Sequence, residues 1–278
     1  MIYFTAMERF MQYWEHIHSS DRILILMIGM VFFWVIEGYY PLFTFSFKRY
    51  KHAGVNLVFL STTLILNLIF GLIVLKVCDW VMSEHIGLLN WILLPLWLKI
   101  IVSLFLMDFF GQYAPHYAMH KIKWMWKFHI IHHSDTKVDV TTGTRHHPGE
   151  WLFRETSTII GIIVIGLPVG FYFLYKSVAA IFTHFNHANL RVPVWIDKPI
   201  SWIFVSPNMH KVHHHYQRPY TDSNYSNIFS LWDRIFGSFK YDNPKNLRYG
   251  LDVLEDSTDE NIGYQFKLPF NKNIKTDY

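Results

Sequence analysis

The sequence is poor in cysteine and in charge. Cys78 is the only cysteine among 278 residues. This excludes an intrachain disulfide framework, a cysteine-based zinc finger and an iron–sulfur cluster held by the thiolates of this chain alone. Charged residues make up 17% of the chain, against roughly 25% in soluble domains. Because hydrophobic residues reach 51% and aromatic residues 18%, the composition predicts a protein that resides in a membrane.

Several other signals are missing. The net charge of +4 is not gathered into a long stripe of Lys and Arg, so nucleic acid is not an expected partner. The chain contains no glycine-rich nucleotide loop and no flavin, haem or iron–sulfur signature. Residues 1–22 lack the basic start and apolar run of a signal peptide. We expect this segment to form an interfacial helix or strap.

Three apolar runs are long enough to cross about 30 Å of hydrocarbon. They cover residues 23–47, 55–77 and 87–107. Glu37 lies within the first run, where an exposed carboxylate is costly in lipid. We expect Glu37 to be a structural hydrogen-bond partner near the end of that span.

The basic residues predict how these spans are oriented. The loop at 48–52 contains Lys48, Arg49 and Lys51, and basic loops favour the cytoplasmic side. Two further crossings return the chain to that side at residue 108. We therefore expect an integral, multi-pass membrane protein whose polar region and active site face the cytoplasm.

Histidines are the most informative feature of the sequence. Residues 108–148 hold seven of the seventeen. One H-x-x-x-H motif and two H-x-x-H-H motifs occur: His116 and His120, then His129, His132 and His133, and finally His210, His213 and His214. Residues three or four apart share a helix face, so each motif can aim several imidazoles at one point. Because one metal takes about four to six ligands, eight or more converging histidines indicate two metals.

The first two motifs require a break in the chain between them. At about 100° per residue, His116 and His120 lie within roughly 40° of each other, whereas the 129–133 motif would lie roughly opposite on one straight helix. A shared centre therefore predicts separate helical segments, with a bend between Lys121 and Lys127. Pro115 is expected to begin or kink a helix.

A fourth apolar run, residues 157–181, is interrupted by Gly166, Pro168 and Gly170. If histidines at 184 and 187 join the same site as His132, this run cannot be a simple crossing. It must return as a hairpin of two short helices or as a re-entrant element buried in protein.

The combined motifs resemble the fatty acid hydroxylase/sterol desaturase superfamily of integral-membrane di-iron enzymes. The resemblance covers roughly residues 100–240. Besides the three motifs above, it rests on RHHP at 145–148, HAN at 187–189, PNMHKVHH at 207–214, NY at 224–225 and LWDRIFG at 231–237. The chain departs from many members at Tyr117, where they have Arg, and this departure removes no ligand.

The resemblance implies nine metal ligands: His116, His120, His129, His132, His133, His187, His210, His213 and His214. Four residues are further candidates, as ligands or as hydrogen-bond partners of ligands: His147, His184, Asp108 and Asn189. Other candidate acceptors for the histidine rings are Asp135, Asp139, Asn186, Asp222 and Asn224. The remaining histidines are expected outside the ligand set: His146 and His215 beside ligands or facing solvent, His52 and His85 at the interface, and His16 and His18 at the surface.

The expected fold is all-α: a multi-span helical membrane protein with a cytosolic helical cap that holds a histidine-rich dimetal site. We expect an N-terminal segment with three spans at 1–107. A catalytic region at 108–240 follows and includes a membrane hairpin at about 156–182. A polar tail at 241–278 ends the chain.

The resemblance implies two iron ions, dioxygen as co-substrate, a membrane lipid substrate, and electrons from a separate ferredoxin or cytochrome with its reductase. Such a site oxidises an unactivated C–H bond, by hydroxylation or by desaturation, and the sequence leaves both open. One alternative is an alkylglycerol-type ether lipid monooxygenase. Another is a non-catalytic membrane protein that binds or transports metal. A structural zinc site would use only about four ligands.

Overall fold

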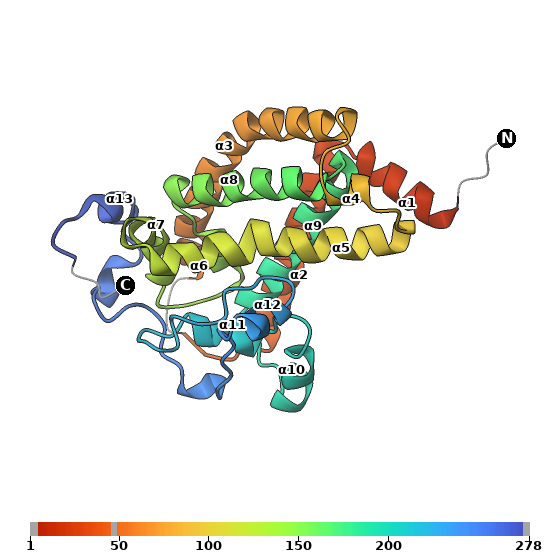
Figure 1. Ribbon diagram of the computed structural model, residues 1–278. Helices are drawn as coiled ribbons and strands as arrows, with labels where there is room; N and C mark the ends of the chain where they lie inside the picture. The colour runs from red at the N-terminus through yellow and green to blue at the C-terminus, as the bar shows by residue number, and fades with distance from the viewer. Residues whose placement is uncertain (1–4, 46–48, 275–278) are drawn as a thin grey trace.

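The computed structural model describes residues 5–45 and 49–274, and within these ranges the chain is helical and has no β-strand. Helices α1 and α13 lie on opposite sides of the molecule (Figure 1). The α-helices are α1 (Ala6–Glu15), α2 (Ser19–Tyr39), α3 (Arg49–Ser83), α4 (Leu88–Trp91), α5 (Leu96–Asp108), α6 (Ala114–Lys121), α7 (Lys123–His133), α8 (Pro148–Ile165), α9 (Val169–His187), α10 (Val194–Ile200), α11 (Pro207–His213), α12 (Leu231–Ile235) and α13 (Ile262–Lys267). Short non-α turns are η1 (Phe109–Tyr113), η2 (Val140–Thr144), η3 (Pro244–Asn246), η4 (Asp256–Thr258) and η5 (Leu268–Phe270).

Three stretches are long and apolar enough to cross a membrane: Ser19–Tyr39, Arg49–Trp91 and Leu96–Lys121. They confirm the predicted class of an all-α membrane protein. Helix α2, which corresponds to the first predicted span, ends at Tyr39, earlier than predicted. The reason is that the residue before Pro41 is biased away from helical geometry. Residues 46–48, at the end of the predicted run, lie outside the described residues.

The third predicted span, 87–107, is wrong in its first half. The chain breaks after α4, and α5 begins after Pro95. The helical stretch extends beyond residue 107 instead, since α5, the π-helical η1 and α6 follow one another without a gap. Pro115 falls in the first turn of α6, where its missing N–H is tolerated. The π-helical turn directly before it is a feature frequent at functional sites.

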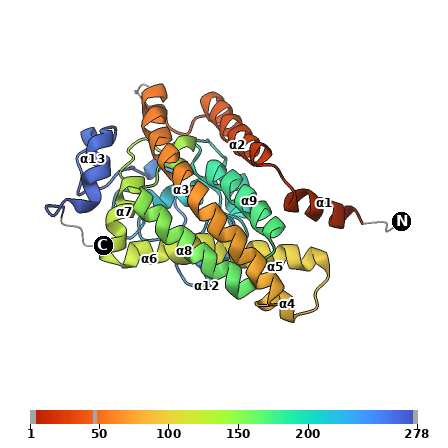
Figure 2. The ribbon, with the colours of Figure 1, turned by 90° about the horizontal axis from the view of Figure 1, so that it is seen from above.

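The predicted bend between the first two histidine motifs is confirmed. Helix α6 ends at Lys121, Ile122 takes an extended conformation, and α7 begins at Lys123. Helix α7 therefore leaves at an angle to α5–α6 (Figure 2). The bend lets α7 present its histidines to those of α6.

Helices α8 and α9 return the chain to the histidines. The turn between them begins at Gly166, whose φ of 72° is in the left-handed region that glycine enters without strain. Both helices extend well beyond the apolar run, from Pro148 to His187. The first residues of α8 and the last residues of α9 consequently lie at the same end of the molecule as α7.

The apolar core joins helices from the whole first two-thirds of the chain. Its buried residues come from α1, α3, α5, α8 and α9, and α1 packs along α9. Glu37, which is 3% exposed, accepts hydrogen bonds from Arg49 Nη2 at 2.6 Å, Val140 N at 3.0 Å and Asn189 N at 2.8 Å. Its predicted structural role is confirmed, because it ties α2 to the segments that flank the histidines.

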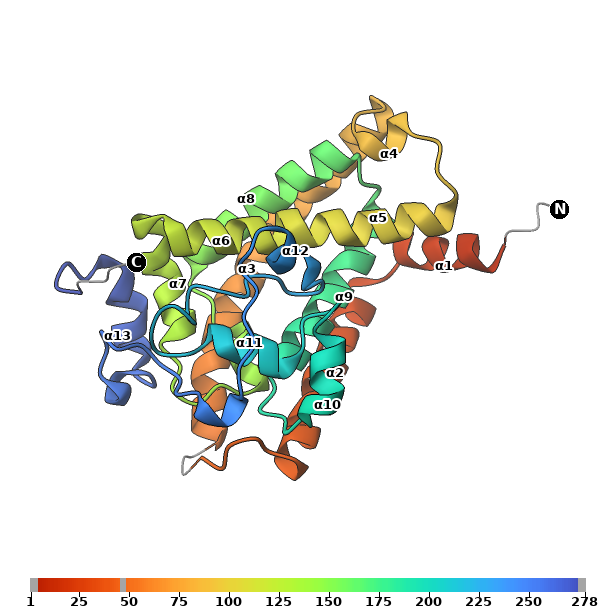
Figure 3. The same cartoon turned by 60° about the horizontal axis from the view of Figure 1, so that its bottom comes forward.

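Helices α10, α11 and α12 lie together on the side of α5–α6 away from α3 and α8 (Figures 1 and 3). Residues 241–274 pack against the helices rather than extending away from them. Leu251 and Leu268 form an apolar cluster with Phe59, Trp126 and Ile130. The C-terminal segment thus covers the outer side of α7.

Candidate metal centre

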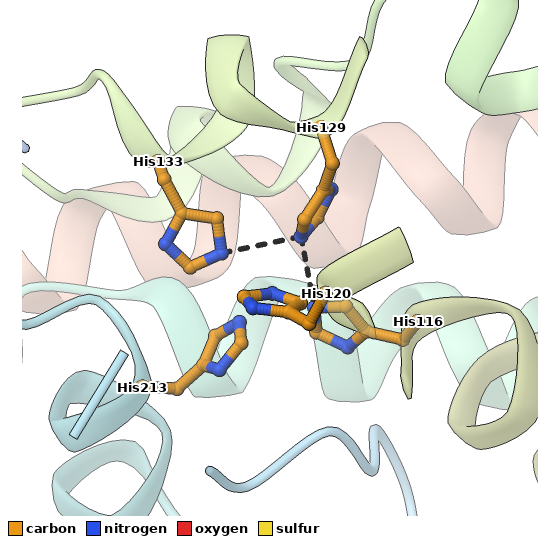
Figure 4. A group of neighbouring side chains, drawn as sticks. All are labelled: His116, His120, His129, His133 and His213. Carbon is orange, nitrogen blue, oxygen red and sulfur yellow. Dashed lines mark hydrogen bonds between the residues drawn. The ribbon is translucent and has the colours of Figure 1, made fainter. Parts of the chain in front are cut away.

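Five histidines from three helices converge in a first group, called group A. They are His116 and His120 of α6, His129 and His133 of α7, and His213 of α11. One ring nitrogen of each lies within 4.8 Å of those of the others. The rings point toward one another (Figure 4), and His129 Nε2 lies 3.0 Å from His116 Nε2 and 3.1 Å from His133 Nε2.

Four further histidines form a second group, called group B. They are His132, His187, His210 and His214. His187 Nε2 lies 3.2 Å from His132 Nε2 and 3.1 Å from His210 Nε2. Groups A and B together contain all nine histidines named as ligands from the sequence.

The two groups adjoin because each H-x-x-H-H motif supplies histidines to both. Adjacent residues on a helix point in different directions, so His132 and His133 divide between the groups, as do His213 and His214. The rings of His133 and His214 stack with centroids 4.9 Å apart. The repeated pattern therefore builds two neighbouring centres rather than one crowded one.

Backbone carbonyls fix the orientation of several rings. The Nδ1 atoms of His116, His187 and His213 lie 2.8, 2.8 and 2.6 Å from the carbonyl oxygens of Tyr225, Thr183 and Ser223. A carbonyl only accepts, so Nδ1 carries the proton in each ring. Each Nε2 is left with a lone pair directed into its group.

These lone pairs fit a bound cation. His129 Nδ1 lies 2.9 Å from a carboxylate oxygen of Glu150, and this contact favours the proton on Nδ1 and a lone pair on Nε2. His116 and His129 then face each other with lone pairs at 3.0 Å, a repulsive arrangement unless a positive ion lies between them. Both ring nitrogens of His120 and of His214 are buried without a hydrogen-bond partner among the described residues. Such nitrogens are costly in a dry interior and are the usual ligands of transition metals.

Burial keeps these imidazoles neutral. Desolvation, followed by the neighbouring imidazoles, lowers the pKa of His132, His133 and His214 well below the usual value. The same two causes lower the pKa of His210. A neutral imidazole has the free electron pair that metal binding requires.

The sequence analysis did not identify Glu150, whose carboxylate lies beside the histidines. Its side chain is fully buried at the start of α8, and Oε1 lies 2.9 Å from His129 Nδ1, His146 Nδ1 and Arg154 Nε. Burial alone would raise the pKa of Glu150, but the two histidines and Arg154 lower it well below its usual value. The ring of His146 in turn stacks on His132 at 4.8 Å. Glu150 therefore supports both groups, and only its position four residues after a histidine could have indicated it.

Replacing Glu150 with Gln is expected to reduce bound iron and turnover by about ten- to a hundredfold, as for other residues that orient metal ligands. The amide keeps one acceptor oxygen but removes the negative charge that balances Arg154 and lies beside the rings of His129 and His146. Metal analysis of the purified protein and product assays measure the two effects. Glu255→Gln, at an exposed position, is the matched control. Full iron retention and full turnover in Glu150→Gln would contradict this role.

The four further candidates lie outside both groups. His184 faces α2, with its ring against the space beside Gly29. His147 caps α8 and accepts a hydrogen bond from Gly149 N. Asp108 accepts from the backbone of Ile228 and Phe229. Asn189 bonds the backbone of Phe43, so these side chains position the surrounding segments.

The prediction that His52 is interfacial is wrong. His52 is fully buried, and its Nε2 lies 2.9 Å from Asp135 Oδ1 while its Nδ1 lies 3.3 Å from Asp139 Oδ2. Two carboxylates that were candidate acceptors for the metal ligands instead hold this ring of α3. Single-sequence patterns cannot show such a pairing, because the partners are separated by more than 80 residues.

The other histidines and acceptors take varied positions. His16, His18 and His85 are exposed, and His215 is partly exposed and accepts from Arg248 N. Asp222 lies 3.9 Å from His120 Nδ1 and is the one predicted acceptor next to group A. Asn186 bonds Asn227, and Asn224 bonds the backbone of Met209 and Lys240.

A cavity of about 160 Å³ lies beside both groups. Its wall includes His116 on one side and His132, His187 and His210 of group B. The side chains of Arg154, Glu155 and Lys176, from α8 and α9, complete it. A small molecule or part of a larger one can thus reach the histidine nitrogens.

Comparison with known protein families agrees with this arrangement. A model of the fatty acid hydroxylase family matches residues 100–238, half of the chain. The chain belongs to the fatty acid hydroxylase family. The resemblance seen in the sequence motifs is thereby confirmed, and the matched segment runs from α5 through α12.

The relatives of this chain within the fatty acid hydroxylase family have names that refer to different lipids. It is 31% identical over 160 residues to alkylglycerol monooxygenase of Homo sapiens, covering 54% of this chain and 32% of the relative. It is 26% identical over 145 residues to ornithine lipid hydroxylase OlsE of Rhizobium tropici, covering 52% and 43%. It is 29% identical over 168 residues to very-long-chain aldehyde decarbonylase GL1-11 of Oryza sativa subsp. indica, covering 58% and 62%. No solved structure matches the chain.

The similarity to the first two relatives is limited to a part of each protein. The matched segment spans about a third of the human protein and about two-fifths of the bacterial one. The family of this chain is one of membrane lipid oxidation that depends on iron, and its histidine groups are suited to hold that metal. The particular lipid and the reaction of the whole protein belong to the proposal below.

Proposed function

We propose that the protein is a membrane-bound, iron- and dioxygen-dependent oxidoreductase that hydroxylates or desaturates a C–H bond of an apolar lipid. The observation that supports it most is the pair of adjoining groups A and B, nine buried histidines in which one ring nitrogen of each lies within 4.8 Å of those of the others in its group. One structural metal would leave half of these imidazoles without a role. Group A would hold one iron ion and group B a second.

An iron pair, when bound and reduced, would supply the electron transfer and dioxygen chemistry that no side chain of this protein has. In hydroxylation, the lipid C–H bond and one dioxygen take up two electrons and two protons and give an alcohol and one water. In desaturation the same inputs give an alkene and two waters. The two electrons come from a separate donor, a ferredoxin or a cytochrome with its reductase.

The residues of the chain would bind, orient and exclude water. Tyr225, Thr183 and Ser223 hold the ligand rings through their carbonyl oxygens. Glu150 would hold His129 and would balance the charge of a metal surrounded by neutral ligands. The buried walls of the cavity would keep bulk water from the reacting carbon.

We propose that residues 108–240 form the catalytic region, with residues 1–107 as membrane anchor and residues 241–278 as a covering tail. The basic residues around 48–52 support a cytoplasmic position for the histidines, near the bilayer surface. A lipid would enter from the bilayer through the side formed by α8 and α9.

Cleavage of an ether lipid is a second candidate reaction. Alkylglycerol monooxygenases from several animals match just over half of this chain. Hydroxylation of the carbon next to an ether oxygen gives an unstable hemiacetal, which breaks into an aldehyde and an alcohol. The same site would therefore serve both reactions, and the lipid supplied would decide between them.

Labelled dioxygen tests the proposal directly. Purified, iron-loaded protein with a reductase system and a membrane lipid extract is expected to place one labelled oxygen in a lipid product if it hydroxylates. An unlabelled alkene would indicate desaturation, and a labelled long-chain aldehyde would indicate ether cleavage. Iron binding without any oxidised lipid would favour a non-catalytic metal-binding or transport protein.

A further inference from the structure

The cavity beside the histidines extends between α8 and α9 to an ion pair whose carboxylate is buried. Lys176 Nζ of α9 donates to Glu155 Oε1 of α8. The Glu155 side chain is only 3% exposed, while that of Lys176 is 36% exposed. Both residues line the cavity together with histidines of groups A and B.

The ion pair of Glu155 and Lys176 leaves some of its hydrogen-bonding groups without partners. Glu155 Oε2 is buried and has no hydrogen-bond partner among the described residues. The ammonium group of Lys176 has three N–H donors, and Glu155 takes one of them. An unsatisfied carboxylate oxygen inside apolar helices is expensive, and such residues in membrane segments are commonly functional. A bound group that donates to Glu155 and accepts from Lys176 would remove the cost.

The position of the pair places such a group close to the metal centre. Glu150 contacts His129 at the start of α8, and Glu155 follows about 7.5 Å further along the same helix. Arg154, between them, bonds both Glu150 and Gln112. A ligand held at Glu155 therefore has its next few carbons beside the histidines.

The charges of the cavity wall favour an uncharged ligand. Arg154 is balanced by Glu150, and Lys176 is balanced by Glu155. At the Glu155 end of the cavity, a phosphate would bring negative charge against the unpartnered carboxylate oxygen, and a quaternary ammonium has no N–H to donate to it. A hydroxyl group both donates and accepts, and it matches the free oxygen and the free donors without adding charge.

We propose that Glu155 and Lys176 bind the uncharged, hydroxyl-bearing head group of a lipid. They thereby select a carbon near that head group for oxidation, rather than a carbon in the middle of an unfunctionalised chain. The selection of a carbon for oxidation rests on the proposed function, whereas the binding of the head group does not. The cavity, at about 160 Å³, is smaller than the roughly 300–1,000 Å³ of pockets that enclose a whole ligand, so only the head group and adjoining carbons enter.

Binding measured without reductant tests the head-group site separately from turnover. The iron-loaded protein is placed in phosphatidylcholine nanodiscs with a radiolabelled 1-O-alkylglycerol, an alkyl phosphate or an alkane of equal chain length. We expect the alkylglycerol to bind at least about tenfold more tightly than either of the others. Glu155→Gln and Lys176→Met are each expected to weaken its binding by about tenfold, with unchanged iron content. Lys198→Met, at an exposed position on α10, is the matched control.

The outcomes separate the two proposals. Selective binding of the alkylglycerol without any oxidised product, once reductant is added, would contradict the proposed reaction and leave the head-group site supported. Equal binding of the three lipids by the wild-type protein would overturn the head-group site, even if either variant fails to fold. Unchanged binding in both folded variants would do the same.

Discussion

Replacing His213 with alanine is expected to abolish turnover, by at least about a hundredfold, and to lower the bound iron per chain by about half. His213 contributes to group A, and its Nδ1 is fixed by the carbonyl of Ser223. Without its Nε2, the metal at group A loses a ligand that no nearby carboxylate replaces, since Glu150 already contacts two histidines and Arg154. Metal analysis and a product assay with labelled dioxygen provide the two measurements.

The neighbouring His215 supplies a matched control, because it belongs to the same run of three histidines. Its ring is partly exposed and its Nδ1 accepts from Arg248 N, away from both groups. His215→Ala should keep its iron and most of its turnover. Group B is tested in the same way by His132→Ala. Retention of the full iron content and of turnover in His213→Ala would exclude group A as a metal site.

The family resemblance, resting on the three histidine motifs, predicted which histidines meet. Helical periodicity required a bend after Lys121, and Ile122 supplies it. The same reasoning could not show how the nine histidines divide into two groups. That division depends on the angle between α7 and α11, and tertiary packing sets that angle.

Residues that support the site were harder to predict than its ligands. The acceptors for three of the rings are backbone carbonyls, which have no sequence signature. Glu150 resembles any acidic residue in the first turn of a helix, where such residues are common. His52 was predicted to lie at the interface, whereas its contact with Asp135 holds it in the interior. These errors share one cause: buried polar partners are chosen by the fold and lie far away in the sequence.

Replacing Arg145 with Met is expected to destabilise the protein by about 3–5 kcal/mol, as when one partner of a buried charged network is removed. The guanidinium group is fully buried. It donates to Ile131 O at 2.9 Å, Asn56 Oδ1 at 3.1 Å and Ser134 Oγ at 3.1 Å, and also to Asp259 O. These acceptors belong to α3, to the end of α7 and to the C-terminal segment. Met fills much of the space but removes all four hydrogen bonds, and only Ile131 O keeps another side-chain donor, Ser134 Oγ.

The loss of stability should appear as a fall in melting temperature on the order of 10 °C, measured by circular dichroism in detergent. Arg248→Met is the control, because its ion pair with Asp256 is 63% and 58% exposed and such pairs contribute less than about 1 kcal/mol. Arg145→Lys keeps the charge but loses the forked geometry, so it should lie between Met and wild type. Ile131 directly precedes His132, and a loosened α7 would therefore also reduce iron binding. Equal melting temperatures for Arg145→Met and Arg248→Met would show that the tail and α7 are held together by apolar contacts alone.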